Sequence, residues 1–196
     1  MIAKKAITSD DILPMETYVQ KRKDLKRALT EVKKNRRIEV GPYATFYFEN
    51  FETMLHQVQE MLYIERGGDE QLADELRAYN PLIPQGRELV ATVMFEIDDP
   101  DHRHRVLSKL GGVEETMAIT VDGERIDAVA EQDVDRTNAA GKASSVQFVH
   151  FPMTEAQAKK FKTPGTQILL GIHHPNYGHM AMMPEKVRAV LSEDLD

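Results

Sequence analysis

Glu65 is the residue whose type and position point most directly to chemistry. The apolar periodicity predicts a helix over residues 51–66, and at 100° per residue Glu65 falls inside its apolar stripe. A carboxylate there is costly unless it is paired or protonated, and one with a perturbed pKa can serve as a general base. Three interpretations stay open: a buried ion pair with Arg36, Arg37 or Arg66, a carboxylate poised at a pocket, or a helix that frays here.

A second candidate is the row formed by Glu52, His56 and Glu60 on another face of the same helix. Histidine and carboxylate side chains one helical turn apart can hold a divalent cation. The row is not the His-Glu-x-x-His arrangement that is typical of zinc sites. The alternative is a solvated helix face with a modest pair interaction between His56 and Glu60.

The densest histidine cluster lies in the run 172–183, which holds His173, His174 and His179 together with three methionines. Histidine with thioether ligands suits Cu(I), whereas histidine with carboxylates suits Zn, Fe or Mn. In a strand, His173 and His174 point to opposite faces, so only one of them can join His179. The hypothesis is therefore a divalent or transition metal bound by His173 or His174 with His179, and no other cofactor is predicted.

The segment Asp101-His102-Arg103-His104-Arg105 has the composition of an active site. It lies at the start of a predicted surface helix, with no apolar cleft apparent around it. The sequence therefore favours an ordinary solvated helix face.

These side chains must be positioned by alternating helices and strands. Helices are predicted over residues 15–34, 51–66, 70–79, 98–110 and 154–162, and from Pro184 onward. Strands are predicted over residues 37–40, 43–48, 89–97, 116–121, 125–130, 145–151 and 167–172. Gly41-Pro42 and Asp122-Gly123 each predict a hairpin. The sum is an α+β fold with a mixed, mostly antiparallel sheet and packed helices in a single compact domain. Residues 1–36 form a basic helical arm packed on an α+β body of residues 37–196.

Composition narrows the classes of protein. The 196 residues include no Cys, which removes thiol nucleophiles, disulfides and cysteine-based metal sites. The N-terminus has no apolar stretch of signal-peptide length, and no window approaches the roughly 20 apolar residues of a membrane span. We therefore expect a cytoplasmic protein with no membrane partner.

The charge is unevenly distributed along the chain. Residues 1–37 carry a balance of +6, whereas the whole chain carries −7. A basic arm on an acidic body can bind nucleic acid or an acidic partner, or it can fold on its own body or on a second copy. The cations that would contact nucleic acid are Lys21, Arg22, Lys23, Lys26, Arg27, Lys33, Lys34, Arg36 and Arg37. Nucleic acid is the least favoured of these partners, because most charge runs are solvated faces.

Several motifs resemble a known bacterial family. They are Lys33-Lys34-Asn35-Arg36-Arg37 followed by Gly41-Pro42, then residues 57–66, Tyr79-Asn80-Pro81-Leu82-Ile83-Pro84, residues 145–151 and His174-Pro175-Asn176-Tyr177. With these motifs the chain resembles domain-of-unknown-function family 3501 over nearly its full length. The resemblance implies no particular activity, and it implies a bacterial setting of redox or oxidative-stress proteins.

The resemblance also indicates where a site would lie. The polar residues in its matching segments are Arg36, Arg37, Glu60, Glu65, Arg66 and Asn80. They stand beside a hairpin and a proline-stiffened segment, which together could build a rigid polar ligand-binding pocket.

The leading interpretation is a cytosolic binding or accessory protein. We expect it to form a homodimer and to act by binding a protein partner or a small ligand. Its interaction surface is the basic N-terminal helix with the adjoining Arg36, Arg37 and Glu65. The rival is a metal- or carboxylate-dependent enzyme that uses Glu60, Glu65 and a histidine. A nucleic-acid-binding protein is the third interpretation.

Overall fold

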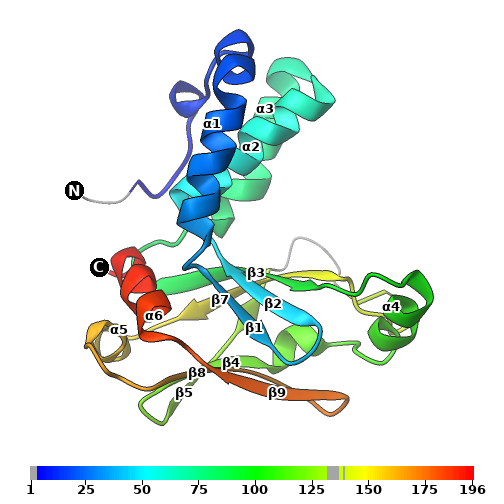
Figure 1. Cartoon of the computed structure of the whole chain (residues 1–196), viewed down its shortest axis with the longest axis vertical. Helices are drawn as coiled ribbons and strands as arrows, with labels where there is room; N and C mark the ends of the chain where they lie inside the picture. The colour runs from blue at the N-terminus through cyan, green and yellow to red at the C-terminus, as the bar shows by residue number, and fades with distance from the viewer. Residues whose placement is uncertain (1–3, 132–136, 139) are drawn as a thin grey trace.

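Two antiparallel sheets stacked on each other form the body of the protein, and a helical arm stands on one of them (Figure 1). The computed structural model of the chain describes residues 4–131, 137–138 and 140–196. The first sheet has the order β1-β2-β3-β7-β6. Its strands are β1 (Arg37–Val40), β2 (Ala44–Phe48), β3 (Glu88–Phe95), β6 (Val129–Ala130) and β7 (Val146–Pro152).

The second sheet has the order β5-β4-β8-β9, and all of its pairs are antiparallel as well. Its strands are β4 (Met117–Val121), β5 (Glu124–Asp127), β8 (Ile168–His174) and β9 (Tyr177–Met182). The main core fills the space between the two sheets, where Phe46, Phe151, Ile119 and Leu170 are fully buried. The expected α+β class is confirmed, with two sheets in place of the one that was expected.

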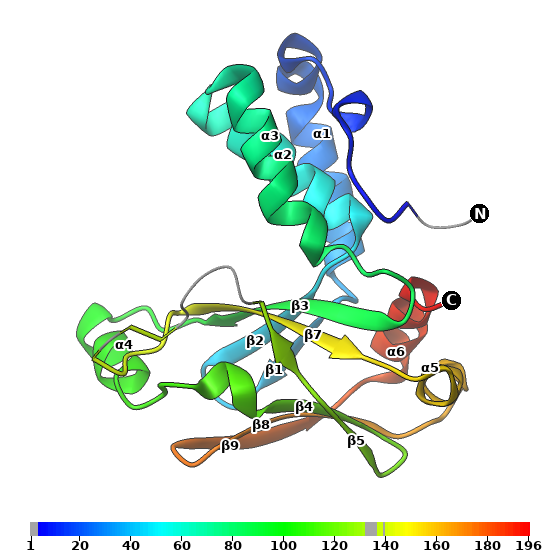
Figure 2. The ribbon, with the colours of Figure 1, turned by 180° about the vertical axis from the view of Figure 1, so that it is seen from behind.

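The helical arm consists of α1 (Met15–Lys33), α2 (Phe51–Glu65) and α3 (Gly68–Tyr79). In Figure 2 all three helices rise away from the sheets, with the N-terminal segment running beside them. The arm has a small core of its own, which reaches the outer face of the first sheet through Val90 and Phe148. Thus α2 and α3, which belong to the stretch 37–196 expected to form the body, stand in the arm together with α1.

Shorter helices cover the ends of the two-sheet body. α4 (Pro100–Leu107) lies at one end, and α5 (Glu155–Lys162) and α6 (Glu185–Leu191) lie at the other (Figure 1). Single 3₁₀ turns complete the fold at Ser9–Asp11, Asn80–Leu82, Val113–Thr116 and Ser192–Asp194. No helix in the described ranges is long and apolar enough to cross a membrane.

The hairpin between β1 and β2 forms as its sequence predicts. Gly41 adopts a φ of 71°, in the left-handed region that glycine enters readily. A Cβ at this position would stand 2.5 Å from the ring of His179 and 2.8 Å from the hydroxyl of Tyr177. Gly41 is therefore required twice, once for the turn and once for the close approach of β9.

Two strand predictions need correction. The strand expected over 125–130 is two strands, because the chain passes from the second sheet to the first at Ala128, whose amide donates to the carbonyl of Met117. β9 was not expected at all. Its outward residues Met180 and Met182 are apolar and exposed, so the strand lacks the alternation by which strands are recognised. The segment between the strands predicted over 125–130 and 145–151 lies partly outside the described residues.

Candidate functional site

A cluster around Glu60 joins α1 to α2. The Glu60 carboxylate receives hydrogen bonds from Arg22 at 2.7 and 2.9 Å, and Lys26 approaches it to 2.9 Å. The Tyr18 hydroxyl donates to the same carboxylate, and the Arg22 guanidinium lies 4.4 Å from the centre of the Tyr63 ring. Tyr18, Arg22 and Lys26 are four residues apart, so they form one row on α1 that faces Glu60.

The donors around Glu60 determine its acidity. The hydrogen bonds from Arg22, Tyr18 and Lys26 lower its pKa to about 2, against the opposing effect of burial. Burial and the neighbouring Glu60 carboxylate raise the pKa of the Tyr18 hydroxyl. A carboxylate with such a low pKa is a weak base at neutral pH, so Glu60 serves best as an anchor that ties the two helices together.

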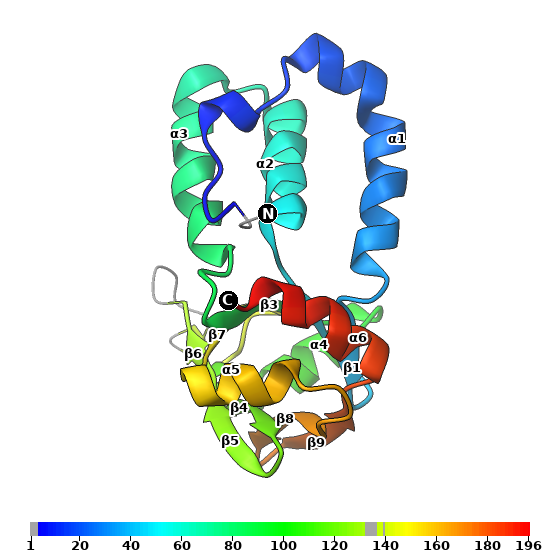
Figure 3. The same cartoon turned by 90° about the vertical axis from the view of Figure 1, so that its left-hand side faces the viewer.

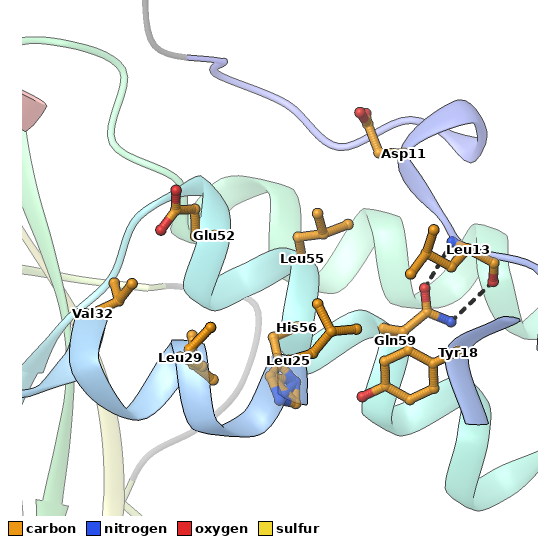
Figure 4. Close-up of a pocket in the computed structure, with 11 residues that line it drawn as sticks. Asp11, Leu13, Tyr18, Leu25, Leu29, Val32, Glu52, Leu55, His56 and Gln59 are labelled. Atoms are coloured by element: carbon orange, nitrogen blue, oxygen red, sulfur yellow. Dashed lines mark hydrogen bonds between the residues drawn. The ribbon is translucent and has the colours of Figure 1, made fainter. Parts of the chain in front are cut away.

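An apolar groove of about 410 Å³ runs between α1 and α2 on the body side of this cluster. Figure 3 shows α1 standing apart from α2, and Figure 4 shows the side chains that line the groove. The groove is lined by Asp11, Leu13, Tyr18, Leu25, Ala28, Leu29, Val32, Glu52, Leu55, His56 and Gln59. Tyr18 is the one residue of α1 that is buried, whereas Leu25, Leu29 and Val32 remain half-exposed. The apolar stripe of α1 is thus open to solvent along the groove.

Polar side chains fix one wall of the groove. Gln59 accepts a hydrogen bond from the amide of Leu13 at 2.8 Å and donates to its carbonyl at 3.2 Å, which holds the N-terminal segment against α2. His56 packs edge-on against the Tyr18 ring, and burial lowers the pKa of its imidazole, which therefore favours the neutral form. Within the described part of the chain, no group of three or more histidine and carboxylate side chains could hold a metal ion.

The predicted ion pair of Glu65 with Arg36, Arg37 or Arg66 is not found among the described residues: Arg36 and Arg37 lie at the opposite end of the arm, and the adjacent Arg66 makes no ion pair with Glu65. α2 leaves the sheet after β2, and its 15 residues carry Glu65 roughly 20 Å away. There Glu65 is exposed and accepts a hydrogen bond from Gln71 at 3.0 Å. Arg36 stays at the base, where it is buried, bonds the carbonyls of Phe48 and Glu49 at 3.0 Å each, and pairs with Asp194. The interpretation of Glu65 as an inward carboxylate is wrong.

The other residues of the predicted polar pocket are also dispersed. Arg66 ends α2 in the left-handed conformation, with a φ of 57°, and is exposed. Asn80 holds the N-terminal segment, because its side chain accepts from the amide of Ile7 at 2.7 Å and donates to the Ile7 carbonyl at 3.0 Å. Arg37 is exposed on β1. The structure therefore does not bring these residues together with Glu60 in one pocket.

The C-terminal histidines have separate surroundings. His174 is buried with both ring nitrogens engaged, one with the Gly111 carbonyl at 3.3 Å and one with the Asn176 amide at 3.2 Å. His179 packs edge to face against Tyr177, with 4.5 Å between ring centres. His173 lies on the opposite face of β8, and burial lowers the pKa of its imidazole. Of the two candidates, His174 shares a face with His179, but its nitrogens are already occupied.

Sequence reasoning missed Tyr18, Arg22 and Lys26 as partners of Glu60. A signal was present, since three polar residues at intervals of four form a single row beside the apolar stripe of α1. What the row contacts depends on how α1 and α2 pack, which the helical period alone does not specify.

Fold and groove together define a class: an α+β protein in which a two-sheet body carries a three-helix arm with an open apolar groove. The chain belongs to the family described as protein of unknown function (DUF3501), whose model matches residues 6–195. It is similar to a protein of unknown function from Burkholderia pseudomallei, known from a crystal structure, with 34% sequence identity and a TM-score of 0.90. That likeness covers 97% of this chain and 100% of the other. A comparison with curated proteins finds no match.

Proposed function

We propose that this protein acts by binding, and that it does so as a homodimer in which the helical arms of two copies pair across their grooves. The observation that carries the proposal is the half-exposed stripe of Leu25, Leu29 and Val32 beside a groove of about 410 Å³. A helix stripe of this kind is normally covered by other parts of the protein. In one copy of this chain it is left open.

The shape of the apolar surface favours a helix as the occupant. Met15 and Val19, which are 37% and 52% exposed, extend the apolar surface of α1 along the adjoining face towards its first turn. The 19 residues of α1 span about 28 Å, which is a length that another helix matches. A two-fold pairing lets each copy cover the surface of the other, since both present the same stripe.

Charges at the edges of the groove suit the same pairing. By helical phase Lys21 borders the apolar stripe of α1, and the exposed Glu52 borders the groove on α2. Two copies that exchange these edges set a cation against a carboxylate. Such contacts favour a defined orientation of the two arms over a nonspecific apolar association.

The test is the mass of the protein in solution, measured by size-exclusion chromatography with light scattering. The native chain is expected to run as a dimer and Leu29→Asp as a monomer, because the new carboxylate would be buried without a partner. Gln20→Asp is the matched control, since it places the same charge on the opposite, exposed side of α1 and should stay dimeric. Circular dichroism checks that both variants keep the helical content of the native protein.

Two results would overturn the proposal. A native chain that stays monomeric at high micromolar concentration has no pairing of the arms. A Leu29→Asp variant that remains as dimeric as Gln20→Asp would place the dimer contact outside the groove.

The rival interpretations gain less support from the geometry. Glu60, the proposed carboxylate of an enzyme, is held as an anion by Arg22 and Lys26. The same contacts engage two of the cations that nucleic acid would require, and Arg36, a third, is buried against Asp194. The cytoplasmic location and the redox setting remain predictions.

A further inference from the structure

A second cavity, of about 320 Å³, lies at the end of the body that carries α4. Three segments distant in sequence enclose it: the turn between β1 and β2, the helix α4 with the residues that follow it, and the turn between β8 and β9. Its lining residues are Tyr43, His102, Arg105, Val106, Lys109, Leu110, Asn176 and Tyr177. It is separate from the groove of the helical arm.

The charges in this cavity are all of one sign. Arg105 and Lys109 line it, and no Asp or Glu is among its lining residues. Within the described part of the chain, neither Arg105 nor Lys109 forms an ion pair. Most other described arginines do, namely Arg22, Arg27, Arg36, Arg77, Arg87, Arg125 and Arg188, whereas Arg37, Arg66 and Arg103 do not. A protein with a net charge of −7 therefore keeps two unpaired cations at one small cavity. Such a cavity attracts anions.

Tyrosine side chains fix the wall opposite these cations. The Tyr177 hydroxyl accepts hydrogen bonds from the amides of Tyr43 and Ala44 at 2.9 and 3.0 Å, and it donates to the Val40 carbonyl at 2.8 Å. The Tyr43 hydroxyl lies 3.1 Å from Nε2 of His102, with the two rings edge to face. These rings are held before any ligand arrives, which lowers the entropic cost of binding.

The remaining wall is tied to the helix as well. Asn176 donates from its side-chain amide to the carbonyl of Lys109 at 2.9 Å, so the turn between β8 and β9 is fixed to the end of α4. Val106 and Leu110 supply apolar surface between the cations and the tyrosines. The cavity thus has a cationic edge and an apolar, aromatic floor.

We infer that this cavity binds a small organic oxyanion, with its phosphate or carboxylate group between Arg105 and Lys109 and its apolar part on Tyr43, Val106 and Leu110. Arginine suits such a ligand because its planar guanidinium bonds two oxygens at once, and lysine adds a point charge. His102 is placed to donate or accept at the edge of the site. Two residues of the segment 101–105, whose composition resembles an active site, line this cavity, namely His102 and Arg105.

The test is isothermal titration calorimetry of the full chain at low salt with three probes: phenyl phosphate, benzoate and inorganic phosphate. Saturable binding of phenyl phosphate or benzoate, tighter than that of inorganic phosphate, supports both the cationic edge and the apolar floor. The stronger of the two aromatic probes identifies the charged group as phosphate or carboxylate.

The variant that tests the site is the double substitution Arg105→Gln with Lys109→Gln, for which we expect at least about a tenfold loss of affinity. Its control is Lys159→Gln with Lys186→Gln, which makes the same change of net charge at exposed positions of α5 and α6, at the other end of the body. The control should bind as the native protein does. Arg105 and Lys109 are exposed, so the double variant is expected to keep the native unfolding transition, which urea denaturation checks.

Three results would overturn the inference. One is the absence of saturable binding of any probe at millimolar concentrations. A second is an equal loss in the control, which would reveal an effect of overall charge. The third is a double variant that is folded and still binds as tightly as the native chain.

Discussion

The helix α1 of the arm and the two-sheet body bury their apolar side chains to very different extents. Between the sheets, Phe46 and Phe151 are fully buried and lie with their ring centres 6.4 Å apart. In the arm, α1 buries Tyr18 alone and leaves the rest of its stripe half-exposed. The body therefore has a complete core, whereas α1 is held by the buried Tyr18 ring, by the Glu60 cluster and by the chain segments at its two ends.

This difference in burial gives the two regions of the chain different roles. Most of the free energy of folding comes from apolar burial, so the sheets supply the stability of the molecule. A helix that buries a single side chain and lines an open groove is free to gain apolar contacts with a partner. The two cavities differ in the same way. The cavity beside α4 is lined by aromatic rings that the body holds in place, whereas the groove is lined by α1, whose apolar stripe is only partly buried.

The largest expected effect tests the contrast in packing. Phe151→Ala should lower the free energy of unfolding by about 3–5 kcal/mol, because it leaves a cavity in a core that cannot collapse around it. Leu29→Ala should cost less than about 1 kcal/mol in a single copy, since water already reaches Leu29. Urea denaturation of dilute protein measures both values.

Equal losses of unfolding free energy in the two variants would contradict the difference in packing between α1 and the body, because Leu29 would then be as well packed as Phe151. A cost for Leu29→Ala that grows with protein concentration would sharpen it, since a stripe covered by a second copy is stabilised by mass action.

Local sequence signals predicted much of the fold. The hairpin at Gly41 and the N-cap of α5, where Thr154 accepts a hydrogen bond from the amide of Gln157, both arise from residues a few positions apart. The break at Ala128 between β5 and β6 has no such local signal. It follows from the pairing of each half with a strand of a different sheet.

The candidate site was harder to predict for the same reason. Helical phase indicates the side of a helix on which Glu65 lies, but it does not indicate what stands beside that side. Arg36 pairs with the carboxylate of Asp194, which lies 158 positions away in the sequence, and no rule based on residue spacing predicts a contact over that separation. The cavity beside α4 is formed by three segments that are distant in the sequence. The composition of residues 101–105 alone therefore did not indicate a cleft.

A smaller effect concerns the ionic cluster of the arm in acid. The folded-state pKa of Glu60 is about 2, below its ordinary value of 4.5. The stability from this contact is therefore complete above about pH 4.5 and is lost as the pH falls towards 2. Glu60→Gln should cost about 1 kcal/mol at neutral pH, less than the whole pKa shift implies, because solvent reaches Arg22 and Lys26. Urea denaturation as a function of pH measures the effect, and the variant should show a flatter acid limb.

The matched control for that measurement is Glu39→Gln, an exposed carboxylate of β1 that makes no ion pair within the described residues. It should leave both the stability and the acid limb unchanged. A Glu60→Gln variant with the same acid limb as the native protein would show that the cluster does not hold the arm.

The smallest effect lies in the body and has the opposite dependence on pH. His150 on β7 lies between Glu88, 3.0 Å from its Nδ1, and Glu131, 3.1 Å from its Nε2. The hydrogen bond to Glu88 raises the pKa of His150 above its ordinary 6.5, with a contribution from Glu131 and against the effect of burial. A raised pKa means that this stability is complete below about pH 6.5 and is lost as the pH rises through the folded-state pKa. We expect a smaller change than for Glu60, because two carboxylates contact His150 whereas three donors contact Glu60.

His150→Gln should remove that alkaline loss, whereas His104→Gln, at an exposed position of α4, should preserve it. Urea denaturation between neutral and mildly alkaline pH makes the comparison, and an NMR titration of the His150 ring gives its pKa directly. An arm that weakens in acid and a body that weakens in base would confirm that the charged groups of the two regions contribute to stability with opposite dependence on pH. If His150 titrates below 6.5, the carboxylates do not stabilise its charged form, and the alkaline half of the contrast fails.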